Sequence, residues 1–262
     1  MKKRIFIKHF FKGAFEGIAG LGNALFFLWS VIVRICKGKI RFAELIKQIY
    51  EQGMQSVVVI ALTSIASGVV LALQGYVMLD RFGAKEQVAT LVGLSLVREL
   101  SPVFSALIFS GKAGARLTAE LGSMSVNNQI VATEVMGVDP IEFLVVPRML
   151  GCLLVFPILV VMSEVIGITG GYLVGVFEAN IPGSFYVNQT LASINYVDFF
   201  SGFIKTFIFA LLIGWICCYQ GFVTKGGSIG VGRYTTKAVA LAYIVVVVSN
   251  TILTKIILTF WG

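Results

Sequence analysis

The chain has 262 residues, of which 57% are hydrophobic and only 13% are charged. A soluble domain carries about 25% charged residues, so this composition excludes an ordinary soluble protein and indicates lipid as the solvent. The net charge of +8 could suggest nucleic acid, but ten of the 21 lysines and arginines lie within residues 1–53. Basic residues beside membrane segments mark the cytoplasmic side, so we expect a cytoplasmic N-terminus and no nucleic-acid partner.

The first unit along the chain is a basic, helical segment over residues 1–53. Its apolar stretch, residues 13–36, resembles a signal sequence, but an amphipathic and basic run follows it instead of a small-residue cleavage site. We expect a helix that lies in the cytoplasmic interface of the membrane. A spanning helix is the alternative, which hydropathy alone does not exclude.

Residues 54–262 are predicted to form one transmembrane domain, since a spanning helix needs about 20 mostly apolar residues. Five stretches qualify, and the second of them is interrupted by charges near its end: 54–78, 100–121, 143–177, 199–222 and 238–261. The run at 86–97 is too short to span alone, so it either extends a neighbouring helix or re-enters beside it. The sequence therefore predicts an all-α integral membrane protein with about five spans and its C-terminus outside.

Arg98 and Glu99 lie just before the second predicted span. Ionisable residues beside membrane segments are costly and are candidates for function. Neighbours in sequence point to different sides of a helix, so we expect incomplete mutual neutralisation. Ser101 and Pro102 resemble a helix cap and first helical residue, which predicts a helix break at Arg98 and Glu99. An interfacial pair without function is the alternative.

The loop after the second span predicts a short amphipathic helix on the cytoplasmic face. It mixes acidic and amide residues with valine and methionine, and Gly137 and Asp139-Pro140 end the helical pattern. Apolar anchors within a polar rim suit a docking partner. The candidate partner-binding residues are Gln129, Glu134, Met136, Gly137 and Asp139.

Glycines recur every four residues in the third span, at Gly167, Gly171 and Gly175. Such a stripe lets two helices approach closely in lipid, so we predict a packing role.

The fourth span carries Lys205 about 10 Å from its outer end, at 1.5 Å per residue. Its ammonium could reach the outer headgroups or face a cavity and hold an anion. The sequence assigns no role to Glu164 or Lys255.

Several chemistries are excluded by what the sequence lacks. Gly111-Lys112 is followed by Ala113, so no phosphate-binding loop is present, and the glycine-rich run Gly226–Gly232 is interpreted as a flexible inner loop. The single histidine, His9, leaves no basis for a catalytic triad or a zinc site. We expect no enzyme activity, no cofactor and no metal. The cysteines are interpreted as small hydrophobic residues: Cys36, Cys152, Cys217 and Cys218.

The chain resembles the MlaE/YrbE-type permeases of ABC transporters that work with MCE proteins, from about residue 40 to the C-terminus. The resemblance rests on six segments, of which the block over residues 95–148 is the most specific: LQGY (Leu73–Tyr76), SLVRELSPV (Ser95–Val103), GKAGARLTAELGSM (Gly111–Met124), EVMGVDPIEFLVVPR (Glu134–Arg148), GGYLVG (Gly170–Gly175) and GVGRYTTKAV (Gly230–Val239).

This resemblance implies a homodimer in the inner membrane, flanked by cytoplasmic ATPase subunits that bind the ATP and by a periplasmic ring of MCE proteins. The implied substrate is phospholipid, held in a cavity between the two copies. The cytoplasmic helix, about Ser123–Val138, would be the coupling helix that docks into the ATPase. Asn250 stands where the family pattern leads us to expect an acidic residue. The implied lipid-binding residues are Leu71, Phe82, Arg98, Glu99 and Lys205.

A stand-alone secondary transporter or channel for an amphipathic substrate is the alternative function. Hydropathy shows no pair of inverted halves, and five spans divide poorly into two, so the permease interpretation is favoured.

Overall fold

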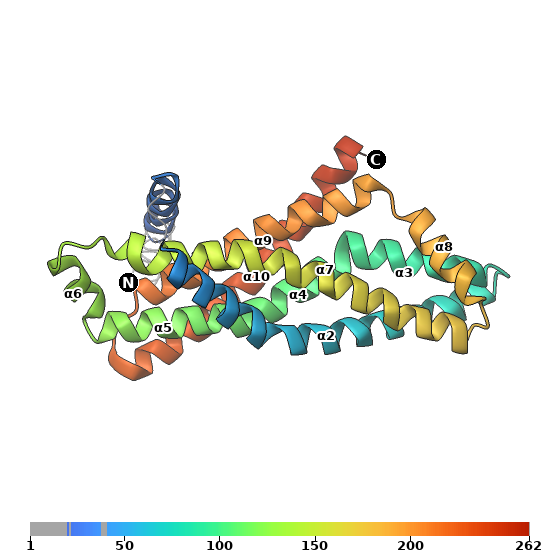
Figure 1. Cartoon of the computed structure of the whole chain (residues 1–262), viewed down its shortest axis with the longest axis horizontal. Coiled ribbons are helices and arrows are strands. Elements are labelled where there is room, and N and C mark those ends of the chain that lie inside the picture. The colour runs from blue at the N-terminus through green and yellow to red at the C-terminus, as the bar shows by residue number, and fades with distance from the viewer. Residues whose placement is uncertain (1–19, 21, 38–40, 262) are drawn as a thin grey trace, which may run out of the picture.

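The structure is a computed structural model that describes residue 20 and residues 22–37 and 41–261. Within these residues every regular element is helical, and five helices are long and apolar enough to cross a membrane. They lie side by side along the long axis of the molecule (Figure 1). The predicted all-α membrane fold with about five spans is confirmed.

The five spans are joined by short segments and two shorter helices. The first is α2 (Phe42–Asp80), and the second runs without a break from Lys85 to Val126. Its parts are η1 (Lys85–Gln87), α3 (Val88–Ser95), η2 (Leu96–Leu100), α4 (Ser101–Phe109), η3 (Ser110–Gly114) and α5 (Ala115–Val126). The remaining elements are α6 (Gln129–Val135), η4 (Ile141–Val145) with α7 (Val146–Phe177), α8 (Gly183–Ser193), α9 (Tyr196–Phe222) and α10 (Gly227–Trp261). Helices α6 and α8 lie at opposite ends of the bundle (Figure 1).

Two local predictions need correction. The helix break at Arg98 and Glu99 was wrong, because η2 is a π-helical turn that carries the helix through these residues. Ser101 is therefore an internal helical residue that caps nothing, and the 86–97 run extends the second span. The flexible loop at Gly226–Gly232 was also wrong, because α10 begins at Gly227. Helix α2 runs through residue 53, and the division of the chain at residues 53 and 54 stays a prediction.

Close packing of α2 against α7 depends on glycines. A side chain at Gly68 of α2 would collide with the carbonyl oxygen of Gly167 in α7. Side chains at Gly171 and Gly175 would strike Val92 and Tyr186, at 2.7 Å and 2.5 Å from the nearest atom. The predicted packing role of this stripe is confirmed, because the small residues let neighbouring elements touch α7 at the backbone.

The cysteines are all free thiols. Cys152, Cys217 and Cys218 are buried, as expected of small core residues, whereas Cys36 is exposed.

The N-terminal helix that the structure describes, Gly22–Cys36, lies across the long axis of the bundle (Figure 1). At 1.5 Å per residue it is about 22 Å long, less than the roughly 30 Å of a hydrocarbon core. Trp215 of α9 donates its indole N–H to the carbonyl of Ala24 at 2.8 Å, and Arg34 donates to Asp139 at 2.6 Å. Its length and direction agree with an interfacial helix, which stays a prediction; residues 13–19 and 21 lie outside the described residues.

Candidate functional site

The π-helical turn η2 brings charged side chains of the second span against α9. A side chain at Gly202 of α9 would collide with the carbonyl oxygen of Val97, so only glycine allows this close approach. Arg98 and Glu99 then point to different partners, as expected for neighbours on a helix. Single π-helical turns within α-helices occur frequently at functional sites.

Lys205 lies in the middle of the resulting cluster and is 1% exposed. Its ammonium donates to Glu99 Oε1 at 2.6 Å, to the carbonyl oxygen of Arg98 at 3.0 Å and to Thr254 Oγ1 at 2.9 Å. Three donors therefore meet three acceptors, which is the full capacity of a lysine. Of the two positions expected from the sequence, reaching the headgroups is wrong: the charge is held inside the protein and is already paired.

Glu99 connects this lysine to the fifth span. Its Oε2 accepts a hydrogen bond from Asn250 Nδ2 at 3.0 Å, and Thr254 Oγ1 lies 2.9 Å from Oε1 and 3.1 Å from Oε2. The Glu99 side chain is 34% exposed, so the carboxylate is bound from one side and open on the other. Asn250 thus contacts Glu99 directly, at the position where an acidic residue was expected.

Arg98 forms a second ion pair with Asp198, the third residue of α9. Arg98 Nε donates to Asp198 Oδ1 at 2.6 Å, and Asp198 Oδ2 accepts the backbone N–H of Asn195 at 3.0 Å. Asn195 and Asp198 form a capping box, which fixes the carboxylate at the start of α9. Asp198 is buried whereas the Arg98 side chain is 46% exposed, so the guanidinium has a free side.

A cavity of about 480 Å³ opens next to the cluster. Glu99 lines it together with side chains of α10: Asn250, Thr251, Thr254, Lys255, Leu258 and Thr259. Its lining is a mixture of one acid, one lysine, an amide and hydroxyls. Such a surface can bind a polar or zwitterionic group while the hydrocarbon part of a ligand contacts the flanking apolar helix faces.

Leu71 and Phe82 do not join this cluster within one chain. Leu71 is partly buried and packs against the apolar cluster that contains Leu96 and Val92. Phe82 is 77% exposed and lines a separate groove at the end of α2 with Val77 and Met78. The structure therefore brings together Arg98, Glu99 and Lys205, and leaves the two implied apolar contacts elsewhere.

The predicted amphipathic helix after the second span is present as α6, at the end of the bundle remote from α8. Its buried face carries Ile130 and Thr133, while Gln129, Glu134 and Met136 are exposed. Gly137 follows with a positive φ of 76°, which favours glycine and ends the helix.

Asp139 fastens this loop to the N-terminal helix through Arg34, at 2.6 Å between Nε and Oδ2. Partial burial would raise the pKa of the Asp139 carboxyl, but hydrogen bonds from Arg34 and from the backbone N–H groups of Ile141 and Glu142 outweigh it. The net result is a pKa below the ordinary value.

Sequence reasoning missed two members of the site, Asp198 and Thr254, and left Asn250 without a role. Asp198 had a detectable signal, because the Asn-x-x-Asp spacing before an apolar run predicts a capping box. Thr254 gave none, since a threonine in an apolar helix usually donates to its own backbone.

A helical bundle with five spans and an ion-pair cluster beside an open polar cavity defines a multi-pass membrane protein with the features of a permease. Residues 45–256 match the family model described as Permease MlaE. The chain is 39% identical over 253 residues to the intermembrane phospholipid transport system permease protein MlaE of Haemophilus influenzae. The aligned region covers 96% of this chain and 97% of the relative. The chain therefore belongs to the MlaE family of ABC transporter permeases.

Two further relatives extend this picture. A probable ABC transporter permease protein of Rickettsia typhi is 38% identical over 90% of this chain and 92% of its own length. The chloroplastic protein TRIGALACTOSYLDIACYLGLYCEROL 1 of Arabidopsis thaliana is 31% identical over 86% of this chain and 65% of its own length. Membership in this family decides against the stand-alone transporter or channel.

Proposed function

We propose that this chain is the permease subunit of an ABC transporter that carries phospholipid between the inner membrane and a periplasmic MCE protein ring. The observation that carries the proposal is Glu99, which lines an open cavity on a membrane-spanning surface and is paired from behind with the buried Lys205. A buried ion pair that is open on one side can exchange its partner for the charged headgroup of a lipid. ATP binding and hydrolysis belong to a partner subunit, and the N-terminus lies on the cytoplasmic side.

The cavity is completed by a second copy of the chain in this proposal. Only 11% of the apolar window of α10 is buried, compared with 56% for the third span. Large side chains next to the cavity are exposed, among them Val248, Ile252 and Ile256. A homodimer that pairs these faces would convert two open half-sites into one enclosed cavity.

The coupling surface is α6 in this proposal. Exposed Glu134, Val135 and Met136 offer an acidic and apolar surface to an ATPase subunit, and the Arg34–Asp139 pair holds the following loop. Because α6 follows α5 directly, movement of α6 would act on the span that carries Arg98 and Glu99.

Lipid recognition begins at Arg98, whose guanidinium is half-exposed and can bind a phosphate while it holds Asp198. Lys205 becomes available only when Glu99 leaves it, so the pair acts as a gate. Leu71 and the exposed Phe82 would contact acyl chains, and Phe82 would do so from outside the charge cluster.

The test is phospholipid transfer by the reconstituted complex of permease, ATPase and MCE protein. Arg98→Glu and Lys205→Glu should each abolish most transfer, because both place a negative charge against the lipid phosphate. Lys85→Glu, in η1, is the charge-matched control, since its ammonium makes no ion pair among the described residues. Unchanged transfer by a folded Arg98→Glu or Lys205→Glu complex would refute the lipid-binding assignment. ATP hydrolysis by the isolated chain would refute the assignment of ATP binding and hydrolysis to a partner subunit.

A further inference from the structure

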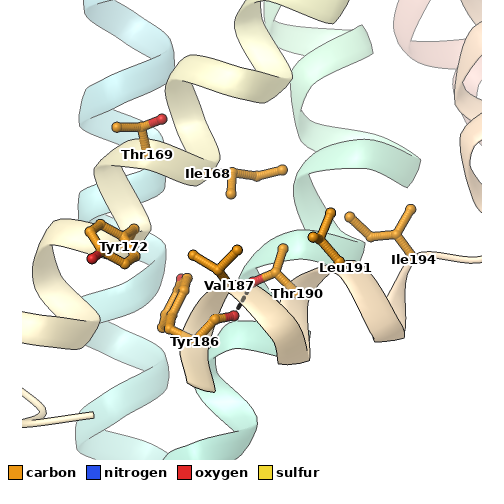
Figure 2. A pocket seen from close by; sticks show the side chains of 8 residues that line it. All are labelled: Ile168, Thr169, Tyr172, Tyr186, Val187, Thr190, Leu191 and Ile194. Atoms are coloured by element: carbon orange, nitrogen blue, oxygen red, sulfur yellow. Dashed lines mark hydrogen bonds between the residues drawn. The ribbon is translucent and has the colours of Figure 1, made fainter. Parts of the chain in front are cut away.

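A second apolar groove lies between the outer part of α7 and the short helix α8, and it shares no lining residue with the cavity beside Glu99 (Figure 2). Its volume is about 310 Å³. The lining carries no charged side chain: Ile168, Thr169, Tyr172, Tyr186, Val187, Thr190, Leu191 and Ile194. Because it opens beside exposed apolar residues such as Val165 and Leu173, the surrounding surface is the one that faces lipid.

The floor of the groove holds a buried hydroxyl without a partner. Tyr186 is 1% exposed, and its Oη makes no hydrogen bond with any group among the described residues. The hydroxyls of Thr169 and Thr190 differ, since they donate to the helix carbonyls of Val165 and Tyr186 at 2.8 Å and 2.9 Å. A buried tyrosine hydroxyl usually has a partner, because leaving it unpaired costs free energy. This lining therefore lacks one hydrogen-bond acceptor.

The groove has rigid walls. Gln189 of α8 donates to Thr90 of α3 at 3.1 Å, which ties α8 to the second span. On the opposite side the Tyr186 ring packs against Gly171 and Gly175 of α7. The groove is thus built into the fold rather than formed by a loose segment.

Tyrosines mark its level in the membrane. Tyr172 and Tyr186 lie together in the lining of this groove (Figure 2), and tyrosine is enriched where hydrocarbon meets headgroups. A phospholipid at that level presents its ester carbonyls next to the start of its acyl chains. The required acceptor and the apolar ligand surface are therefore two parts of the same molecule.

We propose that this groove binds one acyl chain of a membrane phospholipid, with an ester carbonyl of that lipid accepting a hydrogen bond from Tyr186. The half-buried Tyr172, which meets Tyr186 edge-on with ring centroids 5.6 Å apart, rotates aside to expose the hydroxyl. The site is independent of the proposed transport cycle and of the second copy. It serves as a lipid-holding position on the membrane-facing surface.

The experiment uses the purified full chain in nanodiscs of phosphatidylethanolamine and phosphatidylglycerol, doped with a phospholipid that carries a diazirine on one acyl chain. After photolysis, mass spectrometry should find the label enriched at Ile168, Val187 and Leu191 relative to Val58 and Leu62 of α2, which are exposed apolar residues outside the groove and at least as exposed as Ile168 and Val187. Tyr186→Phe should lower labelling of the groove about fivefold, the value of one hydrogen bond.

Leu191→Trp fills the groove and should remove its label, whereas Val165→Trp, on α7 outside the lining, should leave it unchanged. Val187→Trp is a second filling variant, to be used if Leu191→Trp does not yield a monodisperse protein. Even labelling of all exposed apolar faces would overturn the proposal, as would a groove label that survives both filling variants. Labelling that vanishes in membranes containing the assembled complex would also overturn it, because a protein segment would then be the occupant. None of these results depends on ATP or on lipid transfer.

Discussion

Two sets of intramembrane charges in this molecule are built differently. Near the α6 end, Arg116 of α5 bonds to Glu51 of α2 at 2.7 Å and to Glu120 at 2.5 Å. Glu120 also contacts the buried Arg148 of α7 at 3.4 Å. Three spans are tied together by alternating charges, of which Arg148 is buried and Arg116, Glu51 and Glu120 are about a quarter exposed. The Glu99–Lys205 cluster instead has an open side towards a cavity.

The difference indicates what each set does. A charge network that joins three packed helices resists their separation, because removing one member leaves others uncompensated. A pair that borders a cavity loses less when it opens, since water or a ligand can replace the missing partner. The first set therefore holds the bundle together, and the second can change partners during function.

The largest expected effect is at Arg116. Arg116→Met leaves Glu51 and Glu120 facing each other within the bundle, which should cost about 3–5 kcal/mol of the free energy of unfolding. Unfolding in mixed micelles, followed by circular dichroism, measures the loss. Lys112→Met is the control, because this exposed lysine one turn earlier makes no ion pair among the described residues. A loss no greater than that of Lys112→Met would mean that the network is not structural.

A smaller effect is expected at the open pair. Lys205→Met leaves the Glu99 carboxylate with only Asn250 and Thr254, and should cost about 2 kcal/mol because the cavity lets water reach it. The double variant Lys205→Met/Glu99→Gln should recover most of that stability but not lipid transfer. The same unfolding measurement on Lys205→Met, Glu99→Gln and the double variant provides a double-mutant cycle, and transfer is measured in the reconstituted complex. Strictly additive losses would contradict a direct coupling between these side chains.

The contrast also explains which features could be predicted from the sequence. Spanning helices depend on local composition, so the sequence predicts five spans and the amphipathic helix around Glu134. The glycine stripe in α7 was predictable for the same reason. Long-range partners were not: Glu99 and Lys205 are 106 residues apart, and Arg98 and Asp198 are 100 apart. Nothing in a single sequence pairs one buried charge with another across that distance.

The π-helical turn η2 shows where a local sequence rule gives the wrong structure, because the rule for helix starts predicts a break and the helix is continuous. Ser101-Pro102 is a typical helix start, yet proline is also tolerated in a helix where the hydrogen-bond pattern has already shifted, as it has at Leu96–Leu100. The rule identified an irregularity at the right place but assigned it the wrong geometry. Asp198 shows the reverse, because a local capping rule would have placed it correctly at the start of α9.

The smallest effect is expected at Arg34–Asp139, a part-buried pair outside the spans that serves as the reference for both charge sets. Because the folded pKa of Asp139 is lowered, the pair's stabilisation is complete above the ordinary aspartate pKa of about 4 and is lost as pH falls through the folded value. Asp139→Asn should therefore cost less than about 1 kcal/mol at neutral pH and nothing at strongly acidic pH. Unfolding measured across this pH range, with Asp80→Asn at an exposed helix end as control, tests the pair. A pH-independent loss would show that the charge of Asp139 does not carry the effect.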